Sequence, residues 1–362
     1  MNRESSVENN VPFFSVAVPT YDRKDLLRQT ISSLLGQTFA DFEILIGNDY
    51  PNETLSAEYL GIRDARVRIF NNKSNLGELG NMNFLLGQAR GRYFTWQFDD
   101  DPCSSNLLRE IHEAVCRCSF PAVLFTSFTY IYGSRPYRFA KTNGGGIQLY
   151  GGREFLRKYL SGGLRALGCC GFYEVEYLRG LGGVRRLSDG PMALHSEYLL
   201  LIKTGLLTRI AYIPAQLVST RVHDQSWTIA NNDVELFKKA GRNLIRESLA
   251  ILSRAELCAD FGENLSSILR AVLSSVIVKS ILQNKILNKG EINEYVSALR
   301  SEFDPLQGSE FFDQAMAGLN AACRRMRRDI FKAKVKKVMP KRCWKYVHIA
   351  RSLVARYSNK AF

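Results

Sequence analysis

The chain has 362 residues, 46% of them hydrophobic, and a formal net charge of +14 at pH 7. This length is enough for one domain of roughly 220 to 250 residues and a smaller appendage, which excludes a single small core. A membrane-spanning helix is also excluded, because it needs about 18 to 20 consecutive apolar residues and the longest apolar stretch, 269–282, is interrupted by Ser274, Ser275 and Lys279.

The cysteines and histidines lack the spacing of a zinc site. None of the eight cysteines belongs to a C-x-x-C pair, and the four histidines are far apart in sequence, at His112, His195, His223 and His348. The first ten residues are polar and contain no apolar run of the kind found in a secretory signal. We therefore expect a cytoplasmic protein whose cysteines are buried free thiols.

The first 130 residues alternate short β-rich runs with helical patterns. Four strands are predicted, each ending in a polar or acidic loop, at 13–20, 42–48, 67–71 and 92–98. A helix is predicted from about Arg23, where Asp22 caps it and Asp25 stands three residues later as in a capping box. This alternation is typical of a parallel sheet with crossover helices.

The polar loops after these strands are expected to meet. In open α/β sheets the ligand binds beyond the carboxyl ends of the strands. The predicted cleft is therefore formed by the loops at 20–22, 48–50, 71–75 and 99–101.

Five further elements complete the first part of the chain. The glycine-rich stretch 144–152 lacks the G-x-x-x-x-G-K-[ST] pattern of a phosphate loop and is interpreted as a flexible loop over the site. The others are a strand at 122–132, a strand at 167–173, a helix at about 191–204 and an apolar segment at 207–218.

The pattern becomes continuously helical from residue 233, so we place a domain boundary near residue 230. The predicted organisation is a disordered N-terminus, an α/β catalytic domain, a helical region and a basic amphipathic helical tail, at 1–11, 12–230, 231–320 and 321–362.

Almost all of the excess positive charge belongs to the tail. Residues 321–362 contain fourteen Lys or Arg and one acidic residue, whereas the rest of the chain has 35 Lys or Arg and 34 Asp or Glu. Apolar side chains are interleaved with the basic ones, and Pro340 divides the segment. This composition favours a helix pair on an anionic membrane surface over a solvated tail or a nucleic-acid contact. We expect peripheral binding to the inner face of the cell membrane and no nucleic-acid partner.

The triplet Asp99-Asp100-Asp101 directly follows a predicted strand. Three adjacent carboxylates repel one another unless a cation neutralises them. Oxygen ligands of this kind suit Mg²⁺ or Mn²⁺, which are usually held by one or two carboxylates together with substrate phosphates. The triplet therefore predicts a metal and a diphosphate ligand; the alternative is a solvated acidic turn before a helix that begins near Ser104.

Several motifs, in order along residues 13–228, resemble the family 2 glycosyltransferases. The opening block SVAVPTYDRKDLLRQTISSLLGQTFADFEILIGND is similar to the family's first strand, P-T-Y-N-like turn and second strand. Asn75-Leu76-Gly77 and GRYFTWQFDDD resemble its N-x-G helix and D-x-D strand. LGCCGFYEVEYLRGLGG, LHSEYLLLIKTG and STRVHDQS resemble its acceptor-side strand, base segment and R-x-H motif.

The resemblance implies an α/β, GT-A-like fold, in which a mainly parallel, Rossmann-like sheet is flanked by helices, with a C-terminal helical region. It also implies an inverting, metal-dependent transfer of a sugar from a nucleotide-diphosphate donor to a glycan hydroxyl, as in bacterial surface polysaccharide synthesis. If the tail binds a membrane, the acceptor is expected to be a lipid-linked glycan.

Carried over by position, the resemblance assigns donor contacts. Tyr21 is expected to stack on the nucleobase, Thr20 to line the nucleotide pocket, and Asp49 to bind the base or ribose, although D-Y-P stands where the family more often has D-G-S. Asn83 matches a donor-binding asparagine, but Met82 replaces the arginine that often precedes it.

The acidic triplet receives two roles by the same resemblance. Asp99 is assigned to the ribose and Asp101 to the metal, which is expected to be Mg²⁺ or Mn²⁺. Asp100 is the rival for either role. Arg221 is expected to hold the donor's negative charge, and His223 to lie near the diphosphate and metal.

Glu197 stands where the family has its catalytic base, within Ser196-Glu197-Tyr198 in place of E-D-Y. Asp189 is the predicted substitute if Glu197 is not the base. The absence of the first acid motivates one rival, a catalytically inactive glycan- or membrane-binding scaffold. The second rival is a sugar nucleotidyltransferase, which usually has a glycine-rich loop where this chain reads PTYDRKD.

Overall fold

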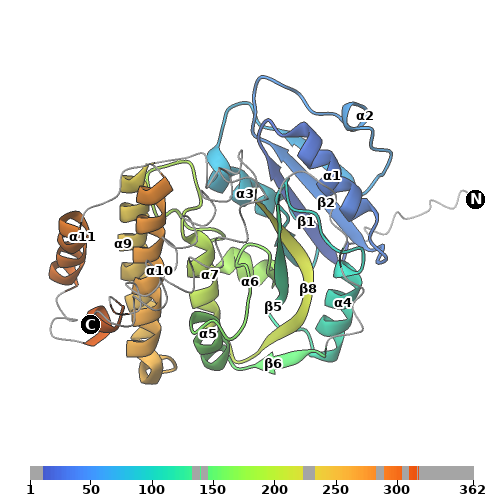
Figure 1. Ribbon diagram of the computed structural model, residues 1–362. Coiled ribbons are helices and arrows are strands. Elements are labelled where there is room, and N and C mark those ends of the chain that lie inside the picture. Colours follow the sequence, from blue (N-terminus) through green and yellow to red (C-terminus); the bar gives the residue numbers. More distant parts are fainter. Residues whose placement is uncertain are drawn as a thin grey trace, which may run out of the picture.

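The computed structural model describes residues 11–132, 139, 146–222, 233–282, 289–303, 310–315 and 317. Within them, a sheet of eight strands is covered by helices on both faces, and a helical unit lies beside it (Figure 1). The predicted boundary near 230, the basic tail 321–362 and His223 lie outside the described residues.

The sheet is mixed and mainly parallel. Its strand order is β3 (Val67–Asn71), β2 (Phe42–Asn48), β1 (Phe14–Thr20), β4 (Tyr93–Trp96), β7 (Phe172–Glu174), β5 (Val123–Tyr132), β8 (Ile210–Val222) and β6 (Gln148–Tyr150). The first four strands run parallel, and β8 is parallel to β5. Strand β7 is antiparallel to β4 and β5, and β6 is antiparallel to β8. The carboxyl ends of β1 to β4 therefore share one edge of the sheet.

Two layers of helices bury opposite faces of the sheet. The helices of this part of the chain are α1 (Lys24–Leu35), α2 (Ala57–Leu60), α3 (Gly77–Gln88), α4 (Leu107–Arg117), α5 (Gly152–Leu160), α6 (Val175–Gly180) and α7 (Ser196–Thr204). Along β1, Val16 and Val18 face the core shared with α1 and α4, whereas Ala17 faces the core shared with α3 and α7. Burial on both sides explains why these strands are continuous apolar runs rather than alternating ones.

The helical unit packs against α7 rather than against the sheet. It contains α9 (Val234–Leu252), a 3-10 turn (Cys258–Asp260), α10 (Phe261–Leu282) and α11 (Lys289–Glu302). Leu200 and Leu201 of α7 belong to the sheet-side core, while Leu199 and Ile202 belong to the core built with α9 and α10. Helix α7 is thus fixed between the two units, as Figure 1 shows. None of the described helices combines the length and apolar character needed to cross a membrane.

Several predicted elements have different bounds in the structure. The strand expected at 167–173 begins only at Phe172, and the helix expected from 191 begins at Ser196. The glycine-rich stretch is not simply a loop, because 148–150 is strand β6 and α5 begins at Gly152. The capping box is wrong: the residue before α1 is Arg23, without a side-chain cap, and Asp22 has a left-handed φ of 52°. The sharp turn at Asp22 directs Arg23 toward the acidic triplet instead.

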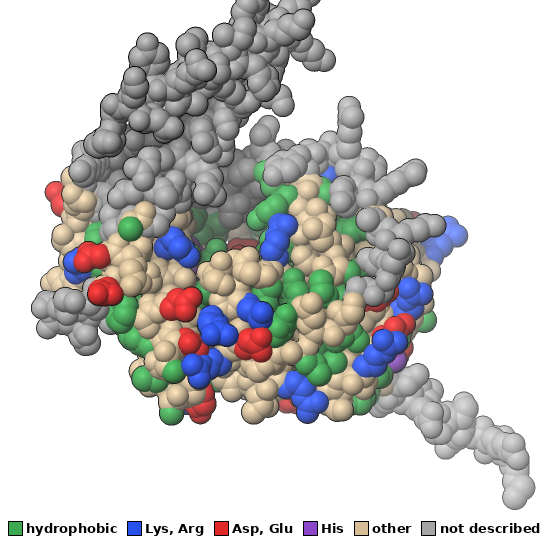
Figure 2. All heavy atoms as spheres, turned by 60° about the horizontal axis from the view of Figure 1, so that its bottom comes forward, with side chains coloured by type: hydrophobic (Ala, Val, Ile, Leu, Met, Phe, Trp, Pro, Cys, Tyr) green, Lys and Arg blue, Asp and Glu red, His purple; other side chains and the backbone are tan. Residues whose placement is uncertain are grey.

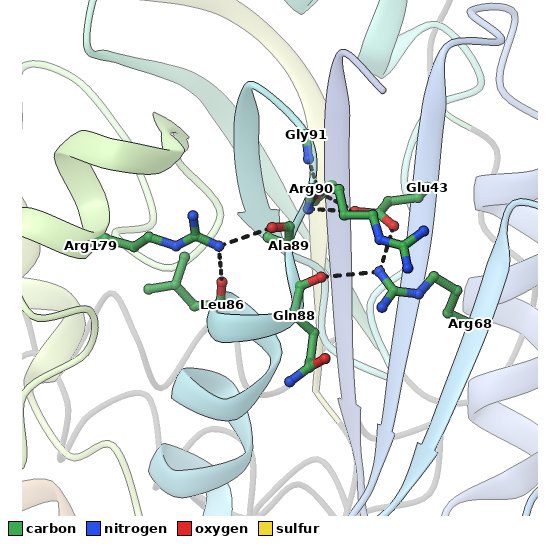
Figure 3. Close-up of polar contacts among 9 residues, drawn as sticks. Glu43, Arg68, Leu86, Gln88, Ala89, Arg90, Gly91 and Arg179 are labelled. Carbon is green, nitrogen blue, oxygen red and sulfur yellow. Dashed lines mark hydrogen bonds and ion pairs between the residues drawn. The ribbon is translucent and has the colours of Figure 1, made fainter. Parts of the chain in front are cut away.

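The far end of α3 is anchored by a buried carboxylate. Glu43 is 6% exposed and accepts hydrogen bonds from the Ser15 hydroxyl at 2.7 Å, the Arg90 amide at 2.8 Å and the Arg68 guanidinium at 2.9 Å (Figure 3). Arg68 also donates to the carbonyl oxygen of Gln88 at 3.0 Å. The last carbonyl groups of a helix have no partner within it, so this contact satisfies one of them.

A second arginine binds carbonyl groups at the same C-terminal end of α3. Arg179 donates to the carbonyl oxygens of Leu86 at 3.2 Å and Ala89 at 2.9 Å (Figure 3). Positive charge at a helix C-terminus is also favoured by the helix dipole. The two arginines hold α3 in a fixed position, so that its N-terminal turn can serve the opposite edge of the sheet.

Replacing Glu43 by alanine is expected to lower the free energy of unfolding by about 1 to 3 kcal/mol, because the buried Ser15 hydroxyl and the partly buried Arg68 guanidinium lose their acceptor. Urea denaturation of Glu43→Ala beside the wild type measures this. Glu58→Ala, at an exposed position of α2, is the control and should stay within about 0.5 kcal/mol of the wild type. Equal stability of both variants would contradict the proposed anchor.

Candidate active site

A cavity of about 410 Å³ opens at the carboxyl edge of β1 to β4. It is lined by the loops that follow β1, β2 and β4, by the start of α3, and by Pro191 and Met192 ahead of α7. Ligand pockets of proteins typically measure roughly 300 to 1,000 Å³. The loops that we expected to converge thus contribute to one cavity of a size suited to a ligand.

The β1 loop and the acidic triplet are joined by polar contacts. The Thr20 hydroxyl donates to Asp99 Oδ2 at 2.7 Å. One Arg23 nitrogen lies 3.4 Å from Asp99 Oδ1 and 3.2 Å from Asp100 Oδ2. Arg23, which sequence reasoning did not assign to the site, is therefore the cation that faces two of the three carboxylates.

Arg221 contacts the other side of the triplet. Its backbone amide donates to Asp101 Oδ1 at 2.6 Å, and its Nε donates to the carbonyl oxygen of Asp100 at 2.8 Å. Residues 120 positions apart are thus brought together at the end of β8, next to the turn after β4. The structure places Arg221 beside the triplet.

The triplet keeps more negative charge than is favourable in its buried position. Burial raises the pKa of Asp99 to about 7, and the charge of Asp100 adds to the shift. Burial, followed by the charge of Asp100, also raises the pKa of Asp101 well above its usual value. A further cation would relieve this repulsion.

The donor set fits a divalent cation only in part. Among the described residues, no group of three or more His, Cys, Asp or Glu is arranged to hold a metal. Asp101 uses one oxygen for the Arg221 amide, so the carboxylate can offer the other to an ion. Mg²⁺ is often held in this way, by one or two carboxylates and substrate phosphates. The residues therefore fit a metal that arrives with a diphosphate.

Tyr21 and Asp49 also line the cavity. The Tyr21 side chain is 47% exposed, and its ring meets that of Tyr50 edge to face, with centroids 5.2 Å apart. Asp49 is buried, and its Oδ1 accepts from the Asn72 amide at 2.9 Å and from the Leu76 backbone amide at 2.8 Å. Tyr21 thus offers an aromatic face and Asp49 a fixed carboxylate, two groups that suit a nucleobase.

The assignment of Asn83 to the donor is corrected. Its amide donates to the Val184 carbonyl oxygen at 2.8 Å and accepts from the Val184 amide at 2.9 Å, and it does not line the cavity. Asn81 lines the cavity instead and donates to the Gly47 carbonyl oxygen at 2.7 Å. Residues two apart on a helix point to different faces, whereas Asn81 is four residues after Gly77, which also lines the cavity. That spacing was the signal that could have identified it.

Glu197 lies in the first turn of α7, a few residues after Pro191 and Met192, and does not itself line the cavity. Burial raises its pKa to about 7, and the charge of Glu78 contributes to the shift. Its carboxylate makes no hydrogen bond to any of the described residues. A Cβ at Gly168 would overlap the Glu197 carbonyl oxygen, so a glycine is needed for α7 to approach this closely. A carboxylate that titrates near neutral pH is suited to accept a proton.

Asp189 is not placed to substitute for Glu197. Its side chain is 77% exposed and pairs with Lys239 of α9, and it does not line the cavity. The physical reason is the packing of α9 on the segment before α7, where Asn243 also donates to the Leu187 carbonyl oxygen at 2.8 Å. Glu78, in contrast, lines the cavity and was not identified from the sequence.

The chain matches the family model described as glycosyl transferase family 2 over residues 15–182. It is 35% identical over 101 residues to the GalNAc(5)-diNAcBac-PP-undecaprenol beta-1,3-glucosyltransferase of Campylobacter jejuni, covering 27% of this chain and 33% of that protein. It is 30% identical over 94 residues to the UDP-Glc:alpha-D-GlcNAc-diphosphoundecaprenol beta-1,3-glucosyltransferase WfgD of Escherichia coli, covering 26% and 37%. The chain thus spans about a third of the length of these curated relatives.

A solved structure extends the similarity in fold. The crystal structure of S. aureus TarS 1-349 superimposes with a TM-score of 0.54 at 14% sequence identity, covering 86% of this chain and 91% of that one. At this identity the likeness concerns the fold alone. It confirms the predicted GT-A-like architecture, a mainly parallel sheet flanked by helices with a helical C-terminal region.

Proposed function

We propose that the protein transfers a sugar from a nucleotide-diphosphate donor to a glycan hydroxyl with inversion at the anomeric carbon, because residues 15–182 match the model of glycosyl transferase family 2. The observation that carries the proposal is one cavity whose wall holds an exposed tyrosine, a fixed carboxylate, Arg23 and Asp99, the first residue of the acidic triplet. The rest of the triplet and Arg221 lie directly next to Asp99, and Glu197 has a pKa near 7.

The donor is proposed to lie along the cavity from Tyr21 to the triplet. Tyr21 stacks on the base, Thr20 lines the nucleotide pocket, and Asp49 accepts from the base or ribose. Asp101 would hold Mg²⁺ or Mn²⁺, which would neutralise the charge that develops on the leaving diphosphate. Arg23 and Arg221, which contact the triplet, would add positive charge near the leaving diphosphate.

Glu197 is proposed to act as the base. The acceptor hydroxyl oxygen attacks the anomeric carbon from the face opposite the diphosphate, and its proton passes to the Glu197 carboxylate. One carbon–oxygen bond forms while the bond to the diphosphate breaks, and the nucleoside diphosphate leaves. Asp99 serves the ribose in this scheme, Asp100 remains the rival of Asp101, and the role of His223 remains an expectation outside the described residues.

The acceptor is proposed to be a lipid-linked glycan in bacterial surface polysaccharide synthesis. Both similar glucosyltransferases carry a diphosphate-linked undecaprenol in their names, although the similarity covers about a third of each. The basic tail 321–362 would bring the enzyme to an anionic membrane surface at its cytoplasmic side. On the face in Figure 2, the described Lys and Arg side chains are interspersed with Asp and Glu, so this face presents no continuous basic patch.

A donor panel tests the proposal. The protein is incubated with UDP-glucose, UDP-galactose, UDP-GlcNAc or GDP-mannose, with Mn²⁺, Mg²⁺ or EDTA, and the release of nucleoside diphosphate is measured with and without a polyprenyl-diphosphate glycan. Metal-dependent release from one donor, accelerated by the acceptor, supports the proposal. Nucleotide binding without turnover would favour the inactive scaffold, and pyrophosphate release from a nucleoside triphosphate and a sugar phosphate would favour the nucleotidyltransferase.

A further inference from the structure

Glu78 is a carboxylate on the wall of the cavity that the scheme above does not use. It stands in the first turn of α3, and its Oε2 accepts from the backbone amide of Ala193 at 3.0 Å. Its Oε1 makes no hydrogen bond within the described part of the chain. The residue is exposed to solvent on the side of the cavity, and desolvation by the surrounding protein raises the pKa of its carboxyl group. One oxygen is therefore left to bind a ligand.

The start of α3 is fixed against the segment that leads to α7. Gly77 has a left-handed φ of 76°, and a Cβ there would lie 2.9 Å from the Pro191 carbonyl oxygen. The Ser196 amide donates to the Ala193 carbonyl oxygen at 3.1 Å, one residue before Glu197. Through Ala193, Glu78 is thus coupled by backbone contacts to the first turn of the helix that carries the proposed base.

Glu78 also shares the cavity with Arg23, the arginine that pairs with the acidic triplet. Arg23 lines the same cavity and pairs with the triplet at 3.2 and 3.4 Å, and the charges of Arg23 and Asp100 both act on the Glu78 carboxyl group. The charge of the Glu78 carboxyl group in turn contributes to the raised pKa of Glu197. Glu78 accordingly lines the same cavity as Arg23, beside the part of the site that would hold the diphosphate, and contacts the segment that leads to the proposed base.

In a displacement of the proposed kind, the transferred sugar must lie between the diphosphate and the base, and so near Glu78, because its anomeric carbon is bonded first to the diphosphate and then to the acceptor oxygen. A carboxylate there can accept hydrogen bonds from sugar hydroxyl groups, and a few such contacts decide which sugar a site accepts. We propose that Glu78 binds hydroxyl groups of the transferred sugar and so determines the choice of donor. This inference rests on the proposed function and adds the residue that recognises the sugar.

The test measures the contribution of the sugar to binding separately from that of the nucleotide. Isothermal titration measures the affinity of UDP and of UDP-glucose, or of the pair selected by the donor panel, for the wild type, Glu78→Gln and Glu78→Ala. Glutamine can still accept from the Ala193 amide, so it keeps the α3 contact. Both variants should bind UDP within about twofold of the wild type, whereas Glu78→Ala should bind the intact donor roughly tenfold more weakly, the loss expected for one hydrogen bond to a charged group.

Glu58→Gln is the matched control, because Glu58 is likewise the second residue of a helix, on the exposed surface of α2. It should leave both affinities unchanged. Equal weakening of UDP and UDP-glucose in Glu78→Ala, or weakening of neither, would overturn the inference. If the wild type bound no nucleotide of the panel, the proposed function itself would fail and this inference with it, an outcome distinct from the other two.

Discussion

Replacing Glu197 by glutamine is expected to lower kcat by about 10² to 10⁴, the usual contribution of a positioned general base. Glutamine has nearly the same size as glutamate but cannot take up the acceptor proton. The affinity for the nucleoside diphosphate should be unchanged, because Glu197 lies beyond the residues that line the donor cavity. Initial rates with the donor and acceptor selected by the panel, together with titration of the nucleotide, measure both quantities.

Glu154→Gln, in the first turn of α5 and exposed to solvent, is the control for this variant and should retain full activity. Asp189→Asn should also retain it, because Asp189 pairs with Lys239 at the surface. Loss of activity in Asp189→Asn but not in Glu197→Gln would show that the assignment of the base is wrong.

The raised pKa of Glu197 gives the rate a defined pH dependence. A base must be ionised, and burial raises the pKa of Glu197 from its usual 4.5 to about 7. The rate should therefore fall roughly tenfold for each pH unit below about 7 and level off above it. Between pH 4.5 and 7 the folded protein holds this proton more tightly than the unfolded chain, so this group lowers stability as the pH rises through that range. Glu197→Gln should remove its contribution to both effects.

Replacing Asp101 by asparagine is expected to lower kcat/KM by about 10² to 10⁴, since metal-assisted charge stabilisation supplies several kcal/mol. The variant without ligand should melt at a higher temperature than the wild type, because one of three repelling buried charges is removed. The rise in melting temperature that UDP and Mn²⁺ together cause in the wild type should be absent. Thermal melting with UDP, with Mn²⁺, with both and with neither measures these effects.

Asp64→Asn is the matched control, because Asp64 pairs with Arg66 away from the cavity and should not affect the response to Mn²⁺. Asp100→Asn distinguishes the two rival carboxylates. A Mn²⁺ response that survives in Asp101→Asn and disappears in Asp100→Asn would transfer the metal assignment to Asp100.

The sequence by itself determined the strands that are buried on both faces. Strand β2 has the bounds expected from the sequence, 42–48, because a strand covered on both faces is a continuous apolar run that ends at its polar loop. The half-buried edge strand β3 also has its expected bounds, 67–71. The same runs placed Thr20, Asp49 and Asp99 at the carboxyl ends of parallel strands. Their meeting in one cavity follows from the geometry of a parallel sheet and needs no knowledge of distant contacts.

The tertiary structure decided which face of α3 meets the cavity. Asn81 and Asn83 are similar in sequence, but rotation along α3 turns one to the cavity and the other to Val184. Arg23, Glu78 and Arg221 acquire their partners from segments 76, 115 and 120 positions away, and no local pattern encodes such pairings. The direction of a side chain on a helix, and the charge that it meets there, depend on how the helices pack, which is the part that residue order along a single chain does not specify.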